Sequence, residues 1–339
     1  MQSTAMRCWI ATALLASTFA WAQGPSMPPS AAPPADTART ATHPSAPAPA
    51  PPPSPVTGIR GKYSAGDLRS AESILEVYRH KYGEDGQYLV GLSWLARGAL
   101  LLGELENADR YVAAVRTRCA DSLARGIDLS RSPDTEIALG AAIEVAAQRI
   151  QQARGRRPAV EFLRQELAKL PEPVSLRSRI YKRLNMMTLE GTAAPELVVE
   201  DFIGATSPSL ASLRGKPVLL FLWAEWCADC RAQAAALAAA RKRHSSNGLQ
   251  IIGLTRYYKD STDARVHEKA RVDSMWKADY KDVGAIPLVL STASMERYGG
   301  SSTPTFVFID RAGVVRRFTP TRLTEEEFDR TMGLMLTRP

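Results

Sequence analysis

The chain has 339 residues, of which 45% are apolar and 23% are charged, and its formal net charge is +8 at pH 7. A chain of this length can bury the cores of about two domains. Its basic residues occur in short clusters without interleaved aromatic side chains, which argues against nucleic-acid binding. Four cysteines, only two of them close together, are too few for a scaffold built on disulfides.

Residues 1–22 have the features of a secretory signal peptide. Arg7 supplies a positive charge, residues 8–20 form a short apolar run, and a small-x-small site at 20–22 predicts cleavage after Ala22. The run is shorter than a membrane-spanning helix needs, although an uncleaved anchor stays open as the alternative. We therefore expect a periplasmic or other extracytoplasmic location, with membrane tethering as an option.

Residues 23–57 are rich in Pro, Ala and Ser and include the run Pro-Pro-Pro-Ser-Pro. Such a segment cannot build a core, and its prolines favour an extended, polyproline-like conformation. We therefore expect a disordered linker between the signal peptide and the first folded domain. Its simplest role is that of a spacer, which is consistent with a periplasmic tether.

Residues 58–188 have the pattern of an all-α domain. Gly66 and Gly103 each begin a Gly-x-Leu-x-x-Ala segment that leads into an amphipathic helix. Further helices are expected over 137–151, 158–170 and 174–187. The two Gly-x-Leu segments resemble tetratricopeptide repeats, whose stacked helix pairs offer grooves for protein partners, over about one and a half units. A helical support without a partner is the alternative.

Residues 189–339 alternate between short apolar runs and helical segments, which predicts an α/β domain. Extended segments are expected over 194–202, 218–222, 250–254, 286–290, 303–310 and 314–318. The 218–222 and 250–254 strands should be parallel, and the last two strands should form an antiparallel hairpin. Helices are expected over 231–240 and 263–280 and after a capping box at Thr324. The predicted fold is a mixed central sheet with helices on both faces.

Cys227 and Cys230 lie between the 218–222 strand and the helix that follows it. The free N–H groups and the dipole at a helix start favour a thiolate, so Cys227 should be the more reactive cysteine. Residues three apart on a helix lie about 5–6 Å apart, which suits a disulfide. Half of a zinc site is the alternative, but Cys8 and Cys119 supply no second ligand pair. Cys119, in an apolar helical region, is expected to be a lone buried thiol.

The motifs Trp-Ala-x-Trp-Cys-x-x-Cys at 223–230 and Thr-Pro-Thr-Phe-x-Phe-Ile-Asp-x-x-Gly at 303–313 resemble the thioredoxin family. The Ala-Pro-Glu-Leu opening at 194–197 is similar to that of its TlpA/ResA-like extracytoplasmic branch. The resemblance covers about residues 191–336 and implies a thioredoxin-like fold with thiol–disulfide oxidoreductase activity, without a bound cofactor or metal. Cys227 would be the attacking thiolate and Cys230 the resolving one.

The same resemblance assigns roles to three neighbours of the cysteines. Pro304 matches the family's cis-proline, which would bring the backbone of Thr303 beside the sulfurs, where it can bond an extended substrate. Trp226 would flank the disulfide as an apolar platform. Substrates would be disulfides in exported proteins, among them apocytochromes c, and electrons would come from a membrane thiol-transfer protein.

Two departures from the family pattern affect the expected chemistry. Phe221 stands six residues before the first cysteine, where cytosolic thioredoxins carry a buried acid, so the usual proton acceptor for Cys230 is missing. Glu225 is a candidate substitute, although an exposed acid is the simpler expectation. Asp229 places a negative charge near Cys227 and disfavours its thiolate, which predicts a reductant.

Three other functions stay open from the sequence. A thiol oxidase or isomerase of the same fold would use the same cysteine pair. A peroxiredoxin-like peroxidase would need Pro-x-x-x-Thr/Ser-x-x-Cys, which residues 223–227 lack. A protein-binding module of the tetratricopeptide type would use the helices of 58–188, with the redox domain secondary.

Overall fold

The computed structural model describes residues 52–170, 175–259 and 261–336. The predicted signal peptide and residues 23–51 of the predicted linker lie outside these ranges. The first helix begins at Val56, inside the segment predicted as linker. Within the described ranges, no helix is both long enough and apolar enough to cross a membrane.

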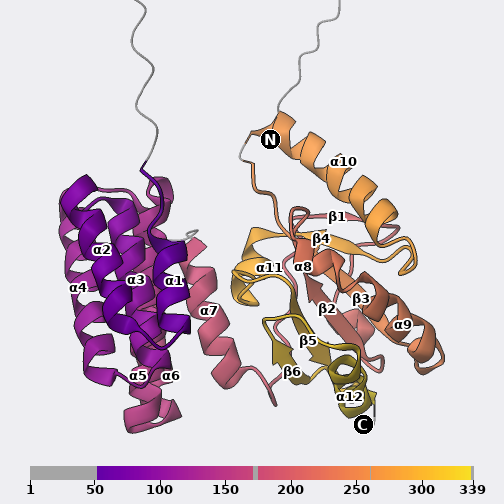
Figure 1. Ribbon diagram of the computed structural model, residues 1–339. Helices are drawn as coiled ribbons and strands as arrows, with labels where there is room; N and C mark the ends of the chain where they lie inside the picture. Colours follow the sequence, from indigo (N-terminus) through magenta and orange to yellow (C-terminus); the bar gives the residue numbers. More distant parts are fainter. Residues whose placement is uncertain (1–51, 171–174, 260, 337–339) are drawn as a thin grey trace, which may run out of the picture. The chain divides into compact units, whose positions relative to one another are not determined.

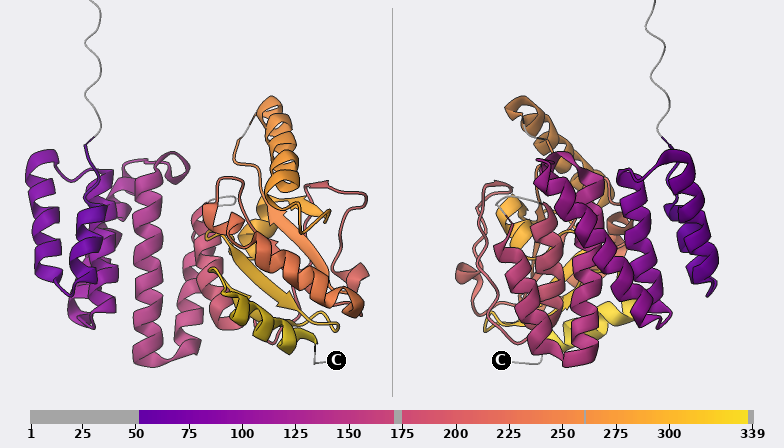
Figure 2. Two further views of the ribbon diagram at one scale, coloured as in Figure 1. Left: turned by 45° about the vertical axis from the view of Figure 1, so that its right-hand side comes forward. Right: turned by 90° about the vertical axis from the view of Figure 1, so that its left-hand side faces the viewer.

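Residues 56–188 form a helical region whose helices pack side by side (Figures 1 and 2). The helices are α1 (Val56–Ser64), α2 (Leu68–Tyr82), α3 (Gly86–Leu101), α4 (Leu105–Ala124), α5 (Pro133–Arg154), α6 (Arg156–Ala168) and α7 (Ser175–Thr188). The predicted glycine turns are confirmed, because Gly66 and Gly103 have φ of 81° and 76° before α2 and α4. Asp67 and Asp85 cap α2 and α3 by accepting the N–H groups of Ser70 and Tyr88, each at 2.9 Å.

One buried carboxylate, Glu144 of α5, holds three of these helices together. Its oxygens lie 2.6 Å from Nη2 of Arg97 on α3, and 3.1 and 2.9 Å from Nη2 of Arg179 and Nζ of Lys182 on α7. Burial acts to raise the pKa of Glu144, but the charges of Lys182, Arg179 and Arg97 outweigh it and hold the pKa at about 2. The carboxylate is therefore ionised at any physiological pH.

The described residues after α7 form one six-stranded mixed sheet with the strand order β1-β4-β3-β2-β5-β6. Its strands are β1 (Asp201–Ile203), β2 (Val218–Leu222), β3 (Gln250–Thr255), β4 (Leu288–Leu290), β5 (Thr305–Ile309) and β6 (Val315–Thr319). As predicted, β2 pairs parallel with β3, and β5 pairs antiparallel with β6. The sheet carries α8 (Ala228–Arg231), α9 (Ala234–His244), α10 (Thr262–Asp279), α11 (Thr292–Arg297) and α12 (Glu325–Leu336).

The buried side chains of β2 alternate between two cores, one on each face of the sheet. Leu219 and Phe221 belong to a core with buried residues of α9, α10 and α12. Leu220 and Leu222 belong to a second core that includes Met295 of α11. Helices thus cover both faces, and the predicted thioredoxin-like α/β fold preceded by an all-α region is confirmed.

The structure corrects two expectations about local structure. Residues 194–200 are not a strand, because their backbone finds partners outside the sheet ladder: the Ala194 N–H donates to the Gly313 carbonyl, and the Val198 N–H donates to the hydroxyl of Ser294, each at 2.9 Å. The helix after the cysteines is also divided. It stops after α8 and resumes as α9, with a tight turn in which the Gln233 N–H donates to the Cys230 carbonyl at 3.0 Å.

The substitution Glu144→Gln tests the buried ion cluster. The folded-state pKa of about 2 lies below the ordinary 4.5, so the ionised carboxylate stabilises the fold fully above that ordinary value and loses its contribution as the pH falls towards 2. We expect the variant to lose roughly 3 kcal/mol of unfolding free energy at pH 7, and the deficit to shrink as the medium is acidified. Urea unfolding at several pH values measures both effects.

Glu76→Gln is the matched control, because Glu76 is half exposed and pairs with Arg79 at the surface of α2. A surface pair of this kind contributes about 0–1 kcal/mol. Equal losses at pH 7 in the two variants would contradict the role given to the Glu144 cluster.

Candidate functional site

The cysteine pair lies where β2 ends and α8 begins. Cys227 is the N-cap residue of α8, and its Sγ accepts the N–H of Cys230 at 3.0 Å. The two residues form a disulfide with a Cα–Cα distance of 5.2 Å. The turn thus holds both sulfurs together at the start of a helix. The described residues contain no group of three or more His, Cys, Asp or Glu that could hold a metal ion.

The two sulfurs differ in their access to solvent. Cys230 is fully buried in the core that contains Phe221, whereas Cys227 keeps 5% of its surface exposed. The neighbouring Trp226 is 63% exposed, and its indole meets the ring of Tyr258 edge-on, with 5.8 Å between centroids. A reacting partner would therefore approach the disulfide from the side of Cys227 and Trp226.

The Thr303–Pro304 peptide bond is cis, as the family match implied. Pro304 immediately precedes β5, which runs antiparallel to β2 with Leu222 opposite Thr305. Continuing this register past the end of β2 places Pro304 and Thr303 alongside the turn that leads to Cys227. Thr303 and Trp226 also line the same cleft. The structure thus brings together Cys227, Cys230, Trp226, Thr303 and Pro304.

Aromatic side chains surround Phe221, which stands where cytosolic thioredoxins carry a buried acid. Phe221 is fully buried and stacks on Phe306 with 5.3 Å between centroids, and it also contacts Trp276 and Tyr280 at 6.4 and 6.0 Å. Such an apolar setting disfavours a charged group in this core, to which Cys230 also belongs. The position that holds the acid in cytosolic thioredoxins is therefore part of an apolar core in this protein.

Glu225 is not the exposed acid that the sequence suggested. Its side chain is only 12% exposed, and both carboxylate oxygens accept from the guanidinium of Arg271 on α10, with 2.5 Å between Nε and Oε2. For Glu225 to accept a proton from Cys230, this bidentate pair would first have to open. The geometry fits better with a role in fixing the turn before Cys227.

Asp229 has a cationic neighbour that sequence proximity did not reveal. Its side chain is 63% exposed and lies 3.4 Å from Nη1 of Arg322. Solvent and this guanidinium both screen its charge from Cys227. The charge of Asp229 therefore has less effect on Cys227 than its position in the sequence suggests.

The sequence analysis missed three residues around the cysteines. Gln233, which is buried, donates to the Leu323 carbonyl at 3.1 Å and accepts its N–H at 2.9 Å, which anchors the segment that carries Arg322. Tyr258 and Arg256 follow β3, and the Arg256 guanidinium lies 4.8 Å from the Tyr258 ring centroid. The sequence could have indicated Tyr258 and Arg256, because they directly follow a strand that is parallel to β2. Residues at the carboxyl ends of neighbouring parallel strands lie at the same edge of the sheet.

The loop that leads to Thr303 packs against α7. The Arg177 side chain lies 2.7 Å from the Glu296 carboxylate, the Asn185 amide donates to the Arg297 carbonyl at 3.0 Å, and Lys182 Nζ donates to the Ser302 hydroxyl at 3.3 Å. At Gly299 the two backbones meet so closely that a Cβ would lie 2.5 Å from the Cα of Lys182. The helical region therefore supports the cis-proline loop directly.

A Cys-x-x-Cys disulfide after a central strand, opposite a cis-proline at the start of the next sheet neighbour, defines a thioredoxin-like redox domain. Residues 191–318 match the AhpC/TSA family, which agrees with this assignment. The C-terminal region is therefore a thioredoxin-like domain, and the resemblance drawn from the sequence is confirmed.

Curated relatives carry names of the same kind. The Thioredoxin-like protein YneN of Bacillus subtilis is 27% identical over 155 residues, which are 45% of this chain and 85% of that protein. The Thiol:disulfide interchange protein DsbE of Pseudomonas fluorescens is 34% identical over 31% of this chain and 52% of its own. The Thiol-disulfide oxidoreductase ResA of Bacillus subtilis is 29% identical over 43% and 75%. The domain is thus a thiol–disulfide oxidoreductase of the DsbE/ResA type, and each match spans less than half of this chain.

Alkylation of the reduced protein tests the difference between the cysteines. Burial raises the pKa of the Cys119 thiol to about 11 from a reference of 9.0, which lowers its thiolate fraction at neutral pH about 100-fold. We expect iodoacetamide to modify Cys227 first and to leave Cys119 unmodified until the protein is denatured. Peptide mass spectrometry measures the order, with Cys227→Ser as the control. Early modification of Cys119 would contradict the structure.

The substitution Gly299→Ala tests the close contact between the cis-proline loop and α7. Gly299 has φ of 71° and no room for a Cβ, whereas Gly248 has φ of 76° and no atom within 4 Å of that position. Gly248→Ala should cost only the strain of positive φ, about 1–2 kcal/mol. Gly299→Ala should lose about 1–3 kcal/mol more through overpacking. Thermal or urea unfolding of both variants measures the difference, and equal losses would contradict the close approach.

Proposed function

We propose that this protein is an exported thiol–disulfide oxidoreductase that reduces disulfides in extracytoplasmic proteins. The observation that carries the proposal is the Cys227–Cys230 disulfide beside a cis-proline loop, in which Cys227 keeps 5% of its surface exposed and Cys230 none. Relatives named for thiol–disulfide interchange support the reaction class. In this proposal Cys227 attacks, Cys230 resolves, and Trp226 and the backbone of Thr303 position the substrate.

The reaction transfers two electrons to the substrate. The Cys227 thiolate attacks one sulfur of the substrate disulfide, which forms a mixed disulfide and releases the other substrate sulfur as a thiolate. Cys230 then attacks the Cys227 sulfur, which restores the domain disulfide and frees the second substrate thiol. Since neither Phe221 nor the paired Glu225 offers a ready proton acceptor, the proton of Cys230 passes to the released substrate thiolate or to water.

The reducing direction rests on the surroundings of the cysteines. A strong oxidant needs a reduced form that is stabilised, usually as a thiolate. Here Cys230 is buried among apolar side chains, which opposes its ionisation. Asp229 adds a smaller effect of the same sign because Arg322 and solvent screen it. A disulfide with these neighbours should have a low reduction potential.

The proposal also covers the source of electrons and the cellular location of the protein. Each turnover leaves the domain oxidised, so a second dithiol must reduce it again, and a membrane thiol-transfer protein would supply those electrons. The features of residues 1–22 support export to the periplasm, and residues 23–57 would serve as the tether. Oxidised cysteine pairs in exported proteins, including apocytochromes c, are the proposed substrates. No bound cofactor is needed.

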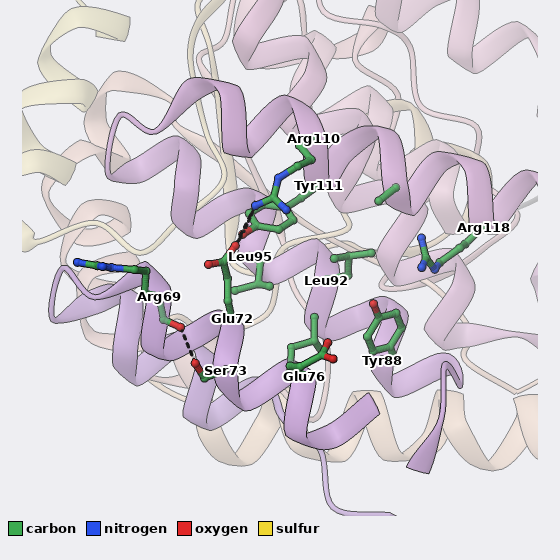
Figure 3. Close-up of a pocket in the computed structure, with 12 residues that line it drawn as sticks. Arg69, Glu72, Ser73, Glu76, Tyr88, Leu92, Leu95, Arg110, Tyr111 and Arg118 are labelled. Atoms are coloured by element: carbon green, nitrogen blue, oxygen red, sulfur yellow. Dashed lines mark hydrogen bonds and ion pairs between the residues drawn. The ribbon is translucent and has the colours of Figure 1, made fainter. Parts of the chain in front are cut away.

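A binding role for the helical region is the second candidate function. Helices α2, α3 and α4 line a hollow of about 560 Å³, where Arg110 and Tyr111 point towards Glu72 (Figure 3). Nη2 of Arg110 lies 2.9 Å from the Glu72 carboxylate, so these charges satisfy each other. A partner that used this hollow would have to compete with that pair, which makes the redox site the better-supported centre.

The peroxidase alternative has weaker support. Residues 223–227 lack the threonine or serine that a peroxiredoxin-like site places before its cysteine, and Trp223 is fully buried. Peroxide consumption by the purified protein would separate the two activities. An oxidase or isomerase differs from a reductase only in its potential and its partner.

The reduction potential of the Cys227/Cys230 pair, measured against glutathione, tests the direction. We expect a value of about −230 mV or lower, together with reduction of insulin disulfides. In the Cys230→Ser variant the mixed disulfide on Cys227 should accumulate because nothing resolves it, whereas Cys227→Ser should form none. A potential above about −180 mV would instead indicate an oxidant or isomerase.

A further inference from the structure

A cleft beside the redox pair has a lining that is rich in positive charge. Its volume is about 570 Å³, and it is bounded by Trp226 and Thr303 on the redox side and by α3, α5 and α7 on the other. We propose that this cationic cleft binds carboxylate groups of the substrate, so that the preferred substrates carry acidic residues next to the disulfide. This inference rests on the proposed function and specifies its substrate class.

Four cations contribute to the cleft, and the described residues that line it include no acid. They are Arg97, Arg179 and Lys182 of the helical region and Arg256 after β3. Glu144, which does not line the cleft, pairs with the first three, so the four cations exceed this one carboxylate by three positive charges. The surplus should draw an acidic segment towards the redox site.

The cations are placed to bind rather than only to attract. The side chains of Arg97, Arg179 and Lys182 are 26%, 17% and 15% exposed, so each is reachable but partly desolvated. Burial lowers the pKa of Arg97, and Glu144 acts in the opposite direction. In such surroundings a charge-assisted hydrogen bond to a carboxylate is stronger than on an open surface.

The cleft adjoins the surface that a substrate disulfide must occupy. Trp226 contacts the Tyr258 ring, and the Arg256 guanidinium lies over that same ring. On the other side, Lys182 donates to Ser302, one residue before Thr303. A polypeptide with its disulfide at Cys227 therefore has cations within a few residues of its cysteine.

The chain's own proline-rich segment is a poor occupant of this cleft. Residues 23–57 contain one acid, Asp36, against Arg39 and His43. An acidic segment of a substrate complements the cleft better. An occupant other than the substrate would leave turnover insensitive to acidic residues next to the substrate disulfide.

Three disulfide-linked peptides, identical except for two Glu, two Gln or two Lys residues beside the cysteines, test the proposal. The full chain would be assayed with dithiothreitol as the electron donor. We expect kcat/KM to fall in the order Glu, Gln, Lys, with the Glu/Gln ratio at about three- to tenfold, as for one or two partly exposed ion pairs. Added salt should reduce this ratio.

Two arginine variants show whether the cleft is responsible. Arg256→Gln, which removes one of the four cations, should reduce the Glu/Gln ratio. Arg265→Gln should leave it unchanged, because Arg265 lies over Tyr257 at 5.6 Å but lines no part of the cationic cleft. A ratio of one in the unsubstituted protein, or a full ratio in Arg256→Gln, would overturn the proposal. No turnover of the Gln peptide would instead contradict the proposed reductase activity itself.

Discussion

The antiparallel pairing of β2 with β5 determines the geometry of the site. The chain leaves β2 for the cysteine turn at the same sheet edge where the cis-proline loop enters β5, with Leu222 opposite Thr305. A slip of one residue would turn every β2 side chain to the other face. Phe221 would then leave the aromatic cluster behind Cys230, so this one register sets both the position and the environment of the sulfurs.

A second constraint ties the helical region to the same loop. Gly299 has no Cβ, which lets the loop backbone reach the Cα of Lys182, and Lys182 in turn bonds Ser302. Lys182 also shares Glu144 with Arg97 and Arg179, so one lysine belongs both to the buried ion cluster and to the loop beside the sulfurs. The helical region is therefore more than a support, because it forms one wall of the cleft at the redox site.

The sequence correctly predicted the elements whose signal is local. It was wrong about, or missed, those that depend on distant partners. The apolar run at 218–222 and the capping box at Thr324 became β2 and the start of α12 as expected. Residues 194–200 contain a shorter apolar run at 197–199, but their partners are Gly313 and Ser294, which no local pattern identifies. The cysteines and Pro304 were found because their spacing is a motif, whereas Tyr258 and Gln233 belong to none.

Charge near the cysteines shows why proximity in sequence is a poor guide to electrostatics. Asp229 is two residues from Cys227, but Arg322 lies beside it in space and its side chain is mostly exposed to solvent. In the proposed reductase, the buried setting of Cys230 is the feature that we expect to lower the reduction potential. The cations of the cleft are partly exposed and act on whatever approaches Cys227. We therefore propose that reduction potential and substrate choice depend on different residues, so that each can change without the other.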